Sequence, residues 1–135
     1  MGQSGSKGPA GGGLIRIEAS GEARILGILT ANGAPSPSPA DFDSSGGGIY
    51  LRCYALSGAS TAQLLAKGGS GGYWASGGGR IAVWRAQDGA GGPFGPNFGF
   101  GTNSALKGTC TSVNGANGTV VYGMLPLRGA IFKFR

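Results

Sequence analysis

The residue types that most often carry out chemistry are sparse in this sequence. It contains five carboxylates, two cysteines and no histidine. Asp41 and Asp43 flank Phe42 in a segment that reads as a loop, and a glycosidase needs two carboxylates held about 5–10 Å apart. Nothing else marks this pair, because the other acids do not cluster around it. Nucleophilic catalysis is also unsupported, since no serine or cysteine has a histidine to activate it. The sequence therefore predicts that the protein is not an enzyme.

Two further sequence patterns were compared with those of phosphate-binding loops and metal sites. The stretch Lys67-Gly68-Gly69-Ser70 has the reverse order of a phosphate-binding loop, and no helix is expected after it. Cys53 and Cys110 stand alone, without the CxxC or Cys/His clusters of a metal site. We therefore expect no cofactor and no metal. The two cysteines are compatible with one disulfide that closes a long loop, and equally with two buried thiols.

Aromatic side chains are the better binding candidates. Tyr50, Tyr54, Trp74 and Trp84 come from neighbouring, similar segments. If these segments stack in register, the four rings form an exposed surface suited to polysaccharide or to another protein. The alternative is that the intervening insertions cover them.

The charge pattern restricts the partners. The net charge is +6, but the basic residues are mostly scattered singly, whereas nucleic-acid binding favours a concentrated basic patch. No apolar run approaches the roughly 18 residues of a membrane-spanning helix. We therefore expect neither nucleic acid nor a membrane span.

Self-comparison gives the organisation of the chain. Three segments begin with GGG and continue into a β-prone stretch, at residues 11–33, 46–69 and 77–89. In each stretch apolar side chains alternate with others, as in a strand with one buried face. The predicted inward residues are Ile15, Ile17, Ile49, Leu51, Ile81 and Val83. We also predict strands at residues 23–29, 62–66 and 130–135, and hairpin-type turns at the Asn-Gly pairs of residues 114–118.

Short strands at a period of 20–50 residues, punctuated by glycine, are typical of a solenoid. We therefore predict an all-β, glycine-rich parallel β-solenoid, a β-helix with loop insertions. Its corners would need positive φ and close backbone approach, which glycine adopts at least cost. The predicted corner residues are Gly11, Gly12, Gly13, Gly46, Gly47, Gly48, Gly77, Gly78 and Gly79.

The stretches GGGIYLRCYALSG, LLAKGGSGG and SGGGRIAVW resemble the glycine-rich tandem repeat of large cell-surface proteins, which are similar to autotransporter-like and filament-forming parallel β-helices. The resemblance covers residues 10–89 and is clearest at 46–85. It implies an extracellular or cell-surface location and a structural role. It implies no catalytic mechanism.

These observations predict a single domain over residues 1–135, with an N-terminal segment to residue 10, glycine-rich repeats at 11–89, and a loop plus C-terminal strands at 90–135. The chain ends are rich in glycine or apolar residues, so we expect copies to join end to end into a homopolymer. The expected function is a structural subunit of an extracellular filament, sheath or surface layer. The alternative is a carbohydrate-binding or adhesion module that uses the exposed aromatics. The candidate assembly residues are Ile131, Phe132 and Phe134.

Overall fold

A computed structural model describes residues 9–37, 42–71, 73–88, 102–110, 112 and 115–126. These residues form β-strands joined by extended segments, and no helix occurs among them. The strands are β1 (Leu14–Glu18), β2 (Glu22–Ile25), β3 (Ile28–Thr30), β4 (Gly48–Gly58), β5 (Gln63–Leu65), β6 (Arg80–Asp88), β7 (Thr102–Ser104) and β8 (Thr119–Met124).

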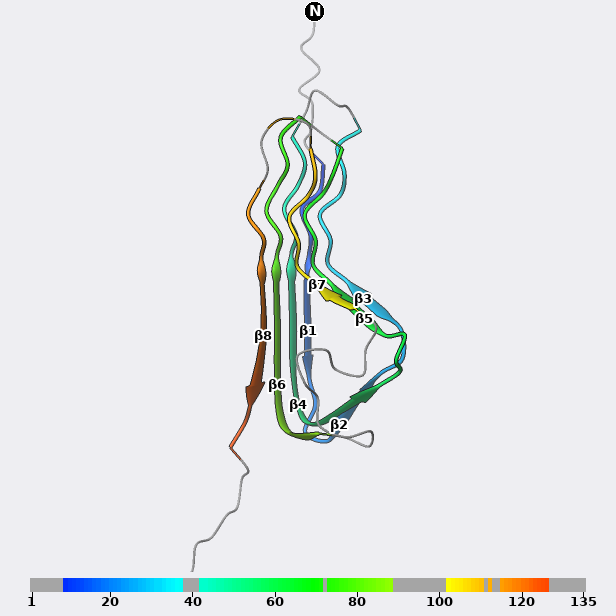
Figure 1. Cartoon of the computed structure of the whole chain (residues 1–135). Helices are drawn as coiled ribbons and strands as arrows, with labels where there is room; N and C mark the ends of the chain where they lie inside the picture. Colours follow the sequence, from blue (N-terminus) through cyan, green and yellow to red (C-terminus); the bar gives the residue numbers. More distant parts are fainter. Residues whose placement is uncertain are drawn as a thin grey trace, which may run out of the picture.

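The strands belong to two sheets, and every paired strand runs parallel to its neighbour. The first sheet has the order β1-β4-β6-β8, with β2 also paired to β4, and the second has the order β3-β5-β7. Figure 1 shows β1, β4, β6 and β8 side by side, with β3, β5 and β7 in a separate group. The repeats stay in register across the first sheet, where Ile15 pairs with Ile49, Ile49 with Ile81, and Ile81 with Val120.

The predicted β-solenoid is wrong, although the all-strand, parallel character is observed. The described residues form two sheets of five and three strands and no closed solenoid. A solenoid needs strands around a lumen filled by side chains. Here the second sheet has strands of only three residues, and the glycine-rich part of each repeat packs backbone against backbone with no side-chain interior.

That glycine-rich packing continues above the first sheet in Figure 1. The Gly47 amide donates a 2.7 Å hydrogen bond to the Ala31 carbonyl, and Gly79 and Gly118 donate equivalent 2.7 Å bonds to Ala66 and Ala105. Each bond joins the segment that enters a strand of the first sheet to one that leaves the second sheet. Two backbone layers therefore meet directly.

The apolar core is formed by side chains from both sheets. It includes the residues that the apolar–polar alternation of β4 and β6 predicted to face inward. Ile49, Leu51, Ile81 and Val83 are at most 1% exposed, and Leu64 of β5 joins the same cluster. The predicted inward faces of β4 and β6 are therefore confirmed. Ile15 and Ile17 of β1 pack against this core but remain partly buried.

The remaining strand predictions have mixed outcomes. Residues 23–29 hold parts of two strands, β2 and β3, separated by Leu26 and Gly27, and residues 62–66 contain β5. The hairpin expected around residues 114–118 is wrong, because β8 follows this segment and pairs parallel with β6. The strand predicted at residues 130–135 lies outside the described residues.

Candidate assembly interface

Eight of the nine glycines predicted as corners lie in the extended segments that lead into β1, β4 and β6, and Gly48 is the first residue of β4. Positive φ is not their role, since Gly71 is the one described glycine in that region, at 116°. A Cβ atom at Gly47 would overlap the backbone of Gly12 and Gly13, and one at Gly79 would overlap that of Gly46 and Gly47. Close backbone approach therefore explains these two glycines. Gly13 faces open space and has no such constraint.

The last strand of the first sheet leaves apolar side chains uncovered. Val120 and Met124 occupy the inward-facing positions of β8, in register with Ile81 and Arg85 of β6. Val120 is 37% exposed and Met124 is 57% exposed, whereas Ile81 is fully buried. The core is therefore closed over β6 and still open at β8.

The first strand of the same sheet has the complementary edge. β1 pairs with β4 on one side, and no other described strand pairs with its opposite side. Its inward residues Ile15 and Ile17 are only partly buried, and Leu14 is 72% exposed. The sheet thus has one open parallel strand at each end, and both present apolar residues at inward positions.

The second sheet ends differently. Asn103 of β7 takes the position that Leu29 and Leu64 occupy in β3 and β5. Its side chain lies beside the Tyr122 hydroxyl of β8. Burial raises the pKa of the Tyr122 hydroxyl to about 12, and the neighbouring Asn103 amide partly opposes that rise. The end of the core at β7 and β8 is thus partly polar, and its apolar edge belongs to the first sheet.

The four predicted aromatic residues do not form one surface. Tyr50, Tyr54 and Trp84 lie on the outward face of the first sheet. The indole of Trp84 lies over Gly123 of β8, where any Cβ would overlap the ring. Tyr54 is 46% exposed, while Tyr50 is half-buried and carries the Arg16 guanidinium 5.7 Å from its ring centroid.

Trp74 belongs to a separate aromatic cluster outside the two sheets. Its ring stacks on Phe42 with centroids 6.0 Å apart, and Tyr73 meets it edge-on at 5.4 Å. A parallel bridge between Phe42 and Trp74 holds the two loops together. Phe42 was not predicted as part of an aromatic surface, because its partner lies 32 residues away and only the stacking of the repeats brings them together.

The cysteines and Asp43, the other described residues considered for chemistry, have structural roles or none that is chemical. Cys53 and Cys110 are both thiols, not a disulfide. Cys53 is buried between the sheets, and this burial raises the pKa of its thiol. The Asp43 carboxylate accepts a 2.8 Å hydrogen bond from the Ser36 amide and so shapes its own loop. In the part of the chain that the structure describes, no group of three potential metal ligands occurs.

Several predicted residues lie outside the part of the chain that the structure describes. Asp41 and the candidate assembly residues Ile131, Phe132 and Phe134 lie outside the described residues. The described residues contain no helix of the length and apolar character needed to span a membrane. The edge residues Val120 and Met124 were not singled out from the sequence. The alternation around them was visible, but their place at the open end of the sheet depends on the number and order of the strands.

No family model, no curated protein and no solved structure matches the chain.

Proposed function

We propose that this protein is a structural, non-catalytic subunit that assembles with copies of itself, as part of an extracellular filament, sheath or surface layer. The observation that carries this proposal is the uncovered apolar edge of the first sheet at β8. Val120 and Met124 are 37% and 57% exposed at positions where the preceding strands are closed. The surface location rests on the resemblance of the glycine-rich repeats to those of cell-surface proteins.

The register of the sheet specifies how a second copy would join. Continuing the pairing from β8 to β1 of the next copy places Val120 opposite Ile15 and Tyr122 opposite Ile17, because these residues share rows across the sheet. Both are inward positions, so the new contact would extend the apolar core. On the outward face, Val121 would meet Arg16 in the same way.

Such a contact is heterologous, because the surface used on one copy differs from that used on the next. Heterologous contacts that do not close into a ring produce open filaments. Exposed parallel edge strands provide the unpaired amide and carbonyl groups for this contact. The proposed product is therefore a polymer in which the first sheet runs on from copy to copy.

A matched pair of substitutions tests the proposed edge contact. Val120→Glu places a carboxylate at the inward, apolar position opposite Ile15, where burial without a partner is costly. Val121→Glu puts the same charge on the neighbouring residue, on the outward face and opposite Arg16. Light scattering and electron microscopy of the full chain over a range of concentrations measure the assembly of each protein.

The expected result is filaments for the unmodified protein and for Val121→Glu, with particles of one copy for Val120→Glu. Circular dichroism of each variant checks that the strands remain folded. A protein that stays monomeric at all concentrations without substitution would contradict the proposal. Equal assembly of the two variants would exclude the β8–β1 contact.

A further inference from the structure

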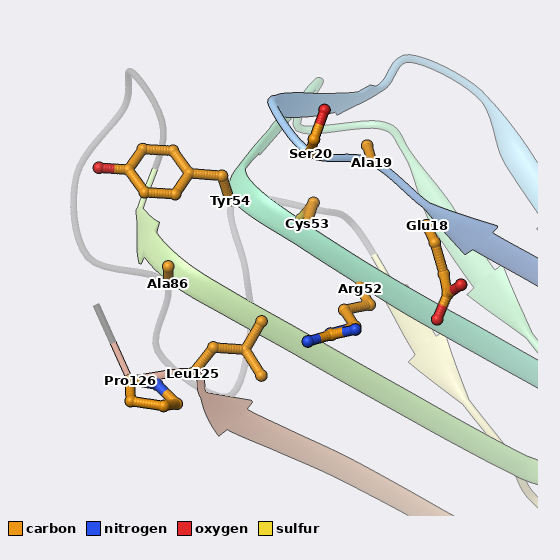
Figure 2. Close-up of a pocket in the computed structure, with 9 residues that line it drawn as sticks. All are labelled: Glu18, Ala19, Ser20, Arg52, Cys53, Tyr54, Ala86, Leu125 and Pro126. Carbon is orange, nitrogen blue, oxygen red and sulfur yellow. The ribbon is translucent and has the colours of Figure 1, made fainter. Parts of the chain in front are cut away.

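An open groove lies on the outward face of the first sheet, away from the edge contact of Val120. It has a volume of about 550 Å³, which falls in the range typical of small-ligand sites. Figure 2 shows Glu18 of β1 and Arg52 of β4 on one side of it, with Leu125 and Pro126, which follow β8, on the other. Tyr54 forms a further part of the wall.

The sizes of three side chains in one row explain the hollow. Ala86 of β6 lies level with Tyr54 of β4, because the residues on either side of them pair as Cys53 with Arg85 and Ala55 with Gln87. The Leu125 amide donates a 2.7 Å hydrogen bond to the Arg85 carbonyl and so brings Leu125 beside Ala86. A methyl group between two large side chains leaves a depression whose floor is Ala86.

One acidic and one basic side chain line the groove, Glu18 and Arg52. Arg16 lies outside the lining, in the outward-facing row of β1. Glu18 is the carboxylate among the groove residues, and its Oε1 is 3.1 Å from Nη2 of Arg16. Arg52 is exposed and forms no ion pair within the described part of the chain. Its guanidinium is therefore available to an anionic ligand.

We propose that this groove binds the carboxylated ring of an acidic sugar, as found in uronic-acid polysaccharides. A guanidinium binds a planar carboxylate through two parallel hydrogen bonds. The Tyr54 ring, 46% exposed, offers an apolar face to the sugar ring. Glu18 and Ser20 supply the acceptor and hydroxyl groups that sugar hydroxyls need. Arg52 and Tyr54 lie on the outward face of the sheet, whereas the proposed edge contact joins inward residues such as Val120 and Ile15.

Calorimetric titration of the full chain with a galacturonic-acid trimer, and in parallel with a neutral galactose trimer, tests the ligand class. We expect the acidic trimer to bind and the neutral trimer to bind at least about tenfold more weakly, because it lacks the charged partner for Arg52. Equal affinity for the two trimers would overturn the proposal, as would equal affinity for inorganic polyphosphate, which would indicate general attraction to positive charge.

Two pairs of variants locate the site. Arg52→Gln is expected to weaken binding of the acidic trimer at least about tenfold. Arg24→Gln removes the same charge from an exposed position of β2 outside the groove and is expected to leave the binding unchanged. Tyr54→Ala is expected to weaken binding, and Tyr73→Ala, at a tyrosine with 45% exposure, is not. Unchanged affinity in Arg52→Gln, or equal losses within each pair, would exclude this groove.

Discussion

At the scale of single residues, Gly123 shows how one missing side chain positions another. The Trp84 indole rests on Gly123, and a Cβ atom there would overlap three carbons of the ring. The glycine thus lets a large aromatic cover the outward side of β8. No feature of the sequence around Gly123 indicates this contact, because Trp84 is 39 residues away and only the register of β6 with β8 pairs the two.

Gly123→Ala is expected to displace the indole and to lower the free energy of unfolding by about 1–3 kcal/mol, the usual cost of overpacking. Tryptophan fluorescence should shift to longer wavelength as Trp84 becomes more exposed. Gly13→Ala is the control, since a methyl group there would meet open space. Equal stability of the two variants would contradict the packing of Trp84 on Gly123.

Tyr122 gives a prediction for alkaline pH. Its pKa is raised from 10.0 to about 12 in the folded protein, so the unfolded chain releases this proton first as the pH rises. The contribution of Tyr122 to stability is therefore complete below pH 10 and is lost progressively between pH 10 and pH 12. Urea unfolding at pH 9 and pH 11 should show a smaller loss of stability in Tyr122→Phe than in the unmodified protein. An identical loss would mean that Tyr122 is not buried as described.

At the scale of elements, the glycine-rich segments define how closely the two backbone layers approach. Gly47→Ala and Gly78→Ala would each drive a methyl group into backbone atoms, those of Gly13 and Ala105 among others. Backbone hydrogen-bonded in layers cannot move aside as a side chain can, so each variant is expected to lose about 3 kcal/mol or more. Thermal melting measures this loss.

The same Gly13→Ala variant is the control for the glycine layer. It adds a methyl group in the same kind of segment, next to Gly12, but without a neighbour within 4 Å. A melting temperature of Gly47→Ala close to that of Gly13→Ala would show that the layers do not meet as closely as the structure has them.

The strands and the glycine segments differ in how far the sequence predicts them. Period-two alternation identified the buried face of β4 and β6 because each strand carries its own pattern. The glycine segments carry no pattern of side chains, so their backbone-to-backbone contact and the absence of a closed solenoid could not be read from them. Close backbone approach was a correct reason for glycines such as Gly47 and Gly79, but positive φ was a wrong one, since none of the nine predicted corner glycines has it.

The candidate binding groove was likewise predictable only in part from the sequence. Arg52 and Tyr54 were visible as outward residues of one strand, and Tyr54 was proposed for binding. The groove depends on Ala86 and Leu125 as well, which reach it from other strands of the sheet. A site assembled across parallel strands from distant repeats depends on their register, which a single sequence leaves undetermined.

At the scale of the whole molecule, assembly and stability are linked. If copies join through β8 and β1, the folded state is stabilised by mass action and its melting temperature rises with protein concentration. We expect this rise in the unmodified protein and a flat dependence in Val120→Glu. Differential scanning calorimetry over a hundredfold range of concentration measures both. A flat dependence in the unmodified protein would argue against association of folded copies.

The shared register of the repeats also affects how this protein can evolve in length. Because β4 fits between β1 and β6 with inward residues matched row by row, a gene could lengthen this protein by an in-frame duplication of residues 46–77. The copied segment would bring one strand for each sheet and its own glycines for the layer above. Growth by whole repeats would then need no new core, whereas the insertion of a single residue in a glycine segment would break every contact that follows it.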